Sequence, residues 1–198
     1  MYTIDNNIKV NKIMTNKSIL YPMREGYYKN GLEDLIDYVN KFSNTKEMVM
    51  IEIGSYAGES TELFAKNFKK VISIDPYIND YDQNDPACQY MDFNEVYNTF
   101  SNVISKYDNI SHIRKISDEA INDLKDIKVD LIYIDGLHTY EQVKKDIENY
   151  KNIINNYGFI SGHDYHPVWQ GVIDAIHETI GEPEMKFQDT SWIKKINK

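Results

Sequence analysis

Short apolar runs rich in valine and isoleucine recur along this chain, each four to seven residues long. Runs of this length and composition are typical of β-strands that are buried on both faces of a sheet. They are Met48–Ile53, Val71–Asp75, Ile110–Arg114, Val129–Asp135 and Gly158–Ser161.

Longer amphipathic segments separate these runs, and their spacing of apolar residues predicts helices. Strands that alternate with helices in this way favour an α/β fold, in which helices cover both faces of a parallel sheet. The predicted helices are Glu59–Phe68, Asn94–Lys106, Asp118–Lys125, Tyr140–Asn155 and Val168–Ile180.

The C-terminal region departs from this alternation. After Gly181-Glu182-Pro183, two short strand-like pieces, Met185–Gln188 and Ser191–Ile196, are separated only by Asp189-Thr190. Two strands so close in sequence must pair antiparallel, because a parallel pair needs a long crossover connection. We therefore expect a sheet of about seven strands, mostly parallel, that ends in an antiparallel hairpin.

Residues 48–198 are predicted to form the main domain, and residues 1–47 a helical extension. The extension carries a predicted helix, Gly31–Phe42, and we expect it to act as a lid or as a wall of a substrate site. The polar stretch Tyr77–Met91 is predicted to be a long surface loop.

Composition limits the partners. A net charge of −9 argues against nucleic acid, because a duplex binder needs a basic surface to neutralise phosphates, and favours a small-molecule substrate. The single cysteine, Cys88, excludes an intramolecular disulfide and agrees with a reducing cytoplasm. No run is long enough to span a membrane and no signal-peptide core is visible, so we expect a cytoplasmic protein.

The segment from Met50 to Ser60 holds the first candidate site. An apolar strand ends in Glu52, Gly54 and Gly58 follow, and a helix begins directly afterwards. Gly54 would allow a tight turn, and Gly58 would let a ligand approach the backbone at a helix N-terminus. The Gly-Lys-Ser/Thr of a phosphate loop and the Gly-x-Gly-x-x-Gly of nicotinamide binding are both absent. A turn without a ligand is the structural alternative.

Asp75 ends the next strand, about 20 residues after the glycine turn, where a carboxylate can accept hydrogen bonds from ribose hydroxyls. The alternative is a turn residue before Pro76.

The stretch Ile51 to Ser60 resembles the first motif of class I S-adenosylmethionine-dependent methyltransferases, which have a Rossmann-like, doubly wound sheet. Asp130 to Glu141, with its Asp-Gly-Leu-His-Thr-Tyr, and Tyr157 to Tyr165, with its His-Asp-Tyr, are similar to macrolide and aminocoumarin sugar O-methyltransferases and cephalosporin hydroxylase-like proteins. The resemblance implies S-adenosylmethionine as cofactor, O-methylation of a small-molecule or sugar hydroxyl, and leaves a homo-oligomer open. It assigns cofactor binding to Glu52, Gly54, Ser55, Tyr56, Gly58, Ser60, Asp75, Ser117 and Asp135, with Asp118 near the adenine.

The resemblance also implies a divalent metal, Mg²⁺ or Mn²⁺, at Asp135, His163 and Asp164. His163 stands where the metal-dependent relatives carry Asp or Glu, and imidazole suits other metals better than magnesium. Three outcomes stay open: metal held by two carboxylates and water, a different metal, or none.

His138 lies three residues after Asp135, at the position of the general base in the resembling sugar methyltransferases. A neutral imidazole can take the proton of a hydroxyl as the methyl group is transferred, and Asp135 would assist. A helix cap is the structural alternative for His138, and His163 or His166 could be the base instead. Tyr140, Tyr165 and Trp169 are candidate walls of the acceptor pocket, and His112 and His177 are predicted to be structural.

Two rival functions remain from the sequence. One is a nicotinamide-dependent oxidoreductase on a related sheet, and the other is a non-catalytic cofactor-binding module that kept the fold.

Overall fold

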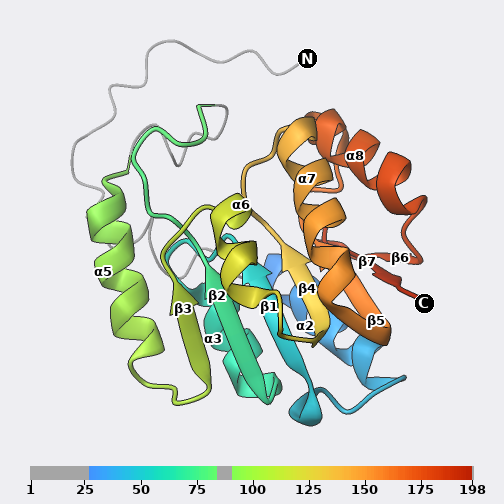
Figure 1. Cartoon of the computed structure of the whole chain (residues 1–198), viewed down its shortest axis with the longest axis horizontal. Helices are drawn as coiled ribbons and strands as arrows, with labels where there is room; N and C mark the ends of the chain where they lie inside the picture. Colours follow the sequence, from blue (N-terminus) through green and yellow to red (C-terminus); the bar gives the residue numbers. More distant parts are fainter. Residues whose placement is uncertain (1–26, 84–90, 198) are drawn as a thin grey trace.

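A computed structural model describes residues 27–83 and 91–197 and contains one mixed sheet (Figure 1). The strands lie in the order β3-β2-β1-β4-β5-β7-β6. Strands β1 to β5 are parallel, and β7 runs antiparallel between β5 and β6. The strands are β1 Val49–Ile53, β2 Lys70–Ile74, β3 Ile110–Ile113, β4 Val129–Ile134, β5 Ile154–Gly162, β6 Met185–Lys186 and β7 Trp192–Lys195.

This topology confirms the α/β prediction, including the terminal antiparallel hairpin with its last strand inserted into the sheet. The helices are α2 Tyr27–Asn40, α3 Glu59–Asn67, α5 Phe93–Ile104, α6 Ser117–Ala120, α7 Tyr140–Tyr150 and α8 Gln170–Ile180. Short 3₁₀ turns connect some of them: η1 Thr45–Glu47, η2 Ile121–Leu124, η3 Lys151–Ile153 and η4 Pro167–Trp169.

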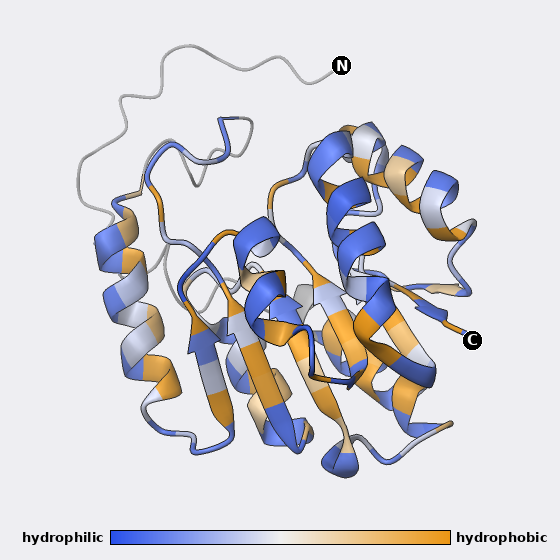
Figure 2. Ribbon diagram, viewed as in Figure 1, coloured by the Kyte–Doolittle hydropathy of each residue, from blue (hydrophilic) through white to orange (hydrophobic). Residues whose placement is uncertain are grey.

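Alternate strand residues enter two cores on opposite faces of the sheet. Ile51 and Ile53 of β1 pack with α6, α7 and α8, whereas Met50 packs with α2 and α3. Figure 2 shows the result: the strands are mainly hydrophobic and the outer helix surfaces mainly hydrophilic. Because both faces are covered, the strands carry continuous apolar runs rather than alternating ones.

Helix α2 belongs to the core. Leu32, Leu35 and Val39 are fully buried and pack in the same cluster as strands β1, β4 and β5. No residue of α2 lines the cavity described below. The expected lid, where it falls on residues 1–26, lies outside the described residues.

The predicted helix Tyr140–Asn155 is wrong at its C-terminal end. Helix α7 ends at Tyr150, and β5 begins at Ile154, which pairs with Val129 before the register shifts. The shift accommodates Tyr157 in a left-handed conformation and a side-chain hydrogen bond from Asn155 to Asp130. Polar residues that suggest a turn thus sit in an irregular strand.

The turns after β1 and β4 meet at Gly54. Gly54 has a φ of 85°, and a Cβ there would lie 1.9 Å from the carbonyl oxygen of Asp135. The N–H of Gly54 donates to Ile74 and that of Asp135 to Ile53, so the ends of three adjacent strands are linked.

Gly54→Ala is therefore expected to destabilise the protein by about 2 kcal/mol or more, because the turns must separate and the backbone is strained. The free energy of unfolding in urea measures it. Gly136→Ala is the matched control: its Cβ would meet only Ile53 Cγ2 at 3.4 Å, with the Ile53 carbonyl oxygen at 3.9 Å. It should cost less than about 1 kcal/mol. Equal stability of the two variants would contradict the close approach.

Candidate functional site

A cavity of about 470 Å³ opens at the carboxyl ends of the parallel strands, where sheets of this kind bind ligands. It runs from the loop after β1, past the ends of β2 and β3, to the loops after β4 and β5. Predicted site residues that line it are Gly54, Ser55, Tyr56, Ser60, Asp75, Ser117, Asp135, His138, His163, Asp164 and Trp169.

Gly58, also predicted to contact the cofactor, is not among the residues that line the cavity. It begins α3 with a φ of 90°, and a Cβ there would lie 3.1 Å from the ring of Phe100 in α5. Helix packing and backbone conformation both require a glycine here. Tyr140 and Tyr165, candidate walls of the acceptor pocket, are not among the residues that line the cavity.

Asp75 fastens the glycine loop to the end of β2. One carboxylate oxygen accepts the backbone N–H groups of Ser55 and Tyr56, both at 3.0 Å, and the other accepts that of Tyr77 at 2.9 Å. Burial raises the pKa of Asp75, although these three donors oppose the rise. The second oxygen keeps a lone pair for another donor.

Glu52 lies beneath the glycine loop and is fully buried. Its carboxylate accepts hydrogen bonds from the hydroxyls of Ser55, Ser60 and Thr61, and it does not line the cavity. Burial raises its pKa to about 7 despite these donors. Its contacts hold the loop and the start of α3 together.

Residues of α7 complete the end of the cavity next to Ser117. The side-chain amide of Gln142 donates to Ser117 Oγ at 3.1 Å and to Asp146 Oδ1 at 3.0 Å. Burial raises the pKa of Asp146 to about 7. Sequence reasoning missed Gln142 and Asp146, because each is one polar position on a helix whose register against the cavity the sequence does not reveal.

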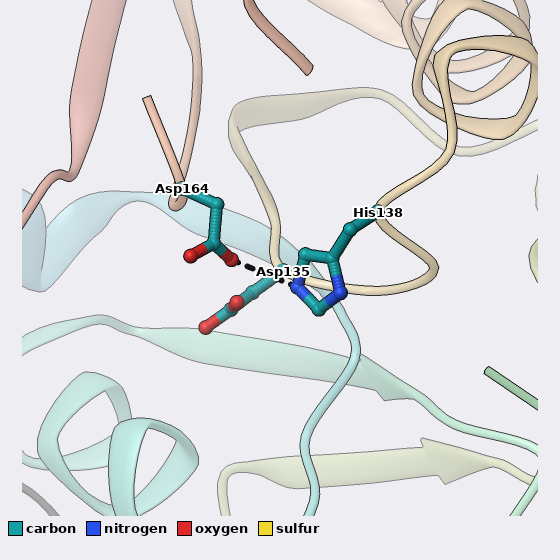
Figure 3. A group of neighbouring side chains, drawn as sticks. All are labelled: Asp135, His138 and Asp164. Atoms are coloured by element: carbon teal, nitrogen blue, oxygen red, sulfur yellow. Dashed lines mark ion pairs between the residues drawn. The ribbon is translucent and has the colours of Figure 1, made fainter. Parts of the chain in front are cut away.

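At the other end, His138 lies between two carboxylates. Nε2 is 2.8 Å from Asp164 Oδ2 (Figure 3), and Nδ1 is 3.1 Å from Asp82 Oδ2. The ring stacks on Trp169, with centroids 4.6 Å apart. Burial alone would lower the pKa of His138, but hydrogen bonds to Asp164 and Asp82 raise it to about 10.

The group Asp135, His138 and Asp164 could hold a metal ion, since their ligand atoms all lie within 4.8 Å of one another (Figure 3). His163, the predicted third ligand, is close by: its Nδ1 is 3.3 Å from Asp164 and 3.6 Å from Asp135. Burial raises the pKa of Asp164, yet hydrogen bonds from His138 and His163 hold it below the usual range. The structure thus brings His138 into the predicted metal group.

His166, the other alternative base, points elsewhere: it caps η4 and does not line the cavity. Asp82, within the predicted surface loop, was missed, because an isolated Asp among polar residues carries no sequence signal.

Comparisons with known proteins give one family. A family model described as a methyltransferase domain matches residues 51–165. An uncharacterized protein of Acanthamoeba polyphaga mimivirus, R132, is 30% identical over 125 residues, or 60% of this chain and 52% of that protein. An uncharacterized protein of Sinorhizobium fredii, y4gI, is 38% identical over 52 residues, or 26% of this chain and 6% of that protein. The chain therefore spans about half of the first relative and a small part of the second.

Solved structures share the fold. CalS11, a TDP-rhamnose 3'-O-methyltransferase of calicheamicin biosynthesis, matches with a TM-score of 0.64 and 12% identity over 95% of this chain and 89% of that one. A Bacillus cereus O-methyltransferase in complex with SAH has a TM-score of 0.62 and 13% identity. The match covers 92% of this chain and 86% of that one. The N-methyltransferase NodS of Bradyrhizobium japonicum, in complex with SAH, has a TM-score of 0.60 and 15% identity. The match covers 92% of this chain and 96% of that one.

Across the part of the chain that the structure describes, no helix has the length and hydropathy to cross a membrane.

The raised pKa of Glu52 predicts a pH effect on stability. The folded state holds the Glu52 proton up to about pH 7, whereas the unfolded chain releases it near 4.5, so stability falls as pH rises between these values. Glu52→Gln removes this fall, which amounts to roughly 3 kcal/mol. Urea unfolding at about pH 5 and about pH 8 measures it.

The exposed Glu47→Gln serves as the control and should follow the wild type. If Glu52→Gln and the wild type lost the same free energy of unfolding between the two pH values, Glu52 would not be the titrating group.

Proposed function

The chain belongs to the family of methyltransferase domains, and from that premise we propose that it transfers the methyl group of S-adenosylmethionine to a hydroxyl oxygen of a small molecule, with a sugar as the candidate acceptor. In this step the O–CH₃ bond forms and the S–CH₃ bond breaks. The hydroxyl proton passes to a base, and the sulfonium becomes a neutral thioether.

One observation carries the proposal: a single cavity joins the glycine loop and Asp75 to His138 and its carboxylates. A cofactor bound at the first end would present its methyl group toward the second. Much of the rate would then come from proximity and orientation.

The residues proposed to contact the cofactor are those predicted positions that line the cavity. Asp75 would accept a ribose hydroxyl with its remaining lone pair while its other contacts hold the loop. Glu52 and Gly58 would act indirectly, by fixing the loop and the start of α3. The contacting set is Gly54, Ser55, Tyr56, Ser60, Asp75, Ser117 and Asp135.

Oxygen is favoured as the acceptor atom by the chemistry at the second end of the cavity. A hydroxyl is a poor nucleophile until a base takes its proton, whereas a neutral amine needs no base to attack. The contacts of half-buried His138 with two carboxylates support its assignment as this base. The fold alone does not distinguish the two chemistries, since NodS is an N-methyltransferase.

The donor set also fits a divalent cation. Asp135 and Asp164 would hold it through carboxylate oxygens, with His163 or His138 as a nitrogen ligand, a mixture that suits manganese, iron or zinc better than magnesium. Such an ion would orient the acceptor hydroxyl and lower its pKa. His138 Nε2 could serve either as ligand or as base, but not as both at once.

The two rival functions have less support than methyl transfer. The glycine loop lacks the nicotinamide fingerprint, and the family match is to methyltransferase domains. A non-catalytic cofactor-binding module is the remaining competitor.

The first test is calorimetric titration of the protein with S-adenosylmethionine and with its demethylated product. We expect saturable binding, weakened about tenfold to a hundredfold in Asp75→Ala, because a ribose acceptor and the loop anchor are both lost. Asp37→Ala, an exposed Asp of α2 that does not line the cavity, is the control and should bind normally. No binding by the wild type, or normal binding by Asp75→Ala, would contradict the proposal.

A second test separates the two functions of His138. If it is the base, His138→Gln keeps Mn²⁺ binding by calorimetry but loses about a hundredfold or more in methyl transfer to an acceptor found by screening sugars and phenols. Asp135→Ala and Asp164→Ala should lose Mn²⁺ binding. Loss of Mn²⁺ binding by His138→Gln would instead show that His138 is a metal ligand. Normal methyl transfer by His138→Gln would contradict the assignment of His138 as the base.

A further inference from the structure

Asp82 is a buried residue in an otherwise exposed segment. Its relative exposure is 4%, whereas Asn79, Asp80 and Gln83 are exposed. A buried carboxylate is costly unless donors satisfy it. Two groups that contact its carboxylate belong to His138, which lies 56 residues later in the chain.

Two groups of His138 converge on one oxygen of Asp82. The ring Nδ1 lies 3.1 Å from Oδ2, and the backbone N–H donates to the same atom at 3.3 Å. These contacts hold both the backbone of His138 and the Nδ1 edge of its ring against Asp82. Trp169 covers a face of the ring, with an angle of 26° between the planes, and Nε2 on the opposite edge points to Asp164.

The segment that carries Asp82 is itself held in place. Tyr77 and Asp80 have φ values of 52° and 58°, a conformation that residues other than glycine rarely adopt. The side chain of Asn79 accepts the backbone N–H of Phe93 at 2.8 Å, which ties the segment to α5. Strained backbone persists only where surrounding contacts enforce it, and such positions cluster at functional sites.

Building on the proposed function, we propose that Asp82 is a positioning residue for methyl transfer: it accepts the Nδ1 proton of His138 and keeps Nε2 directed at the acceptor hydroxyl. A neutral imidazole carries its proton on one nitrogen, and the hydrogen bond at that nitrogen decides which one. A carboxylate at Nδ1 therefore leaves Nε2 to take the hydroxyl proton, and it stabilises the imidazolium that forms.

The two carboxylates beside His138 have different functions in this arrangement. Asp164 lies on the Nε2 side, with Asp135 and His163, where the acceptor and any cation would bind. Asp82 lies on the Nδ1 side, outside the group Asp135, His138 and Asp164. Asp82 therefore acts through His138.

The test is NMR of the histidine ring nitrogens in the full chain labelled with the heavy nitrogen isotope, with His138→Gln used to assign the signals. We expect Nδ1 of His138 to be protonated and its proton to exchange slowly with water. Asp82→Asn should speed this exchange by about tenfold or more, because the charged acceptor is lost. Asp80→Asn, its exposed neighbour, is the matched control and should leave the exchange unchanged.

Unchanged exchange in Asp82→Asn would overturn the proposal. A wild-type ring protonated at Nε2 alone would also overturn it, and this result does not depend on the folding of Asp82→Asn.

Methyl-transfer kinetics with the screened acceptor complete the test. Asp82→Asn should bind S-adenosylmethionine within about twofold of the wild type and keep its acceptor KM, while kcat falls about tenfold to a hundredfold. In a His138→Gln background the same change should cost nothing further, because Asp82 acts only through the imidazole. Normal binding with normal kcat would contradict the role of Asp82 alone, whereas no binding by the wild type would contradict the proposed function.

Discussion

The close contact between two backbone turns fixes the strand ends that carry Asp75 and Asp135. The carbonyl oxygen of Asp135 occupies the space that a side chain on Gly54 would need, and backbone hydrogen bonds link the ends of β2, β1 and β4 at this point. Asp75 follows β2, on one side of β1, and Asp135 follows β4, on the other side. The separation between Asp75 and Asp135 across the cavity is therefore set by the sheet.

The carboxylates around the cavity differ in which groups contact them. Asp75 receives backbone N–H groups and Glu52 receives hydroxyls, whereas Asp82 and Asp164 face an imidazole. Neutral hydroxyl donors offset burial only in part, so the pKa of Glu52 rises to about 7. A facing imidazole that becomes charged compensates more fully, so the pKa of Asp164 falls. The acidic residues around the cavity thus divide into those that anchor the glycine loop and those that contact His138.

Local patterns in the sequence predicted most of the fold, because buried parallel strands and amphipathic helices have distinct apolar spacings. They also located Gly54, Asp75 and Asp135, since each follows a strand directly and parallel strands end at one edge. Asp82 could not be found this way: its partner lies 56 residues away, and its loop has no periodicity. The packing of Gly58 against α5 could not be predicted either, because it depends on tertiary structure.

The pair of carboxylates that holds His138 also keeps it protonated. With both in contact its pKa is about 10, so near neutral pH the ring has a proton on each nitrogen. A base needs one nitrogen free, and in the proposed arrangement this is Nε2, because Asp82 holds Nδ1 and also accepts the backbone N–H of His138. The contact that must change is therefore Nε2 to Asp164. Asp164 has other candidate partners, His163 at 3.3 Å and any bound cation. If His138 is the base, what Asp164 binds decides when the imidazole can accept a proton.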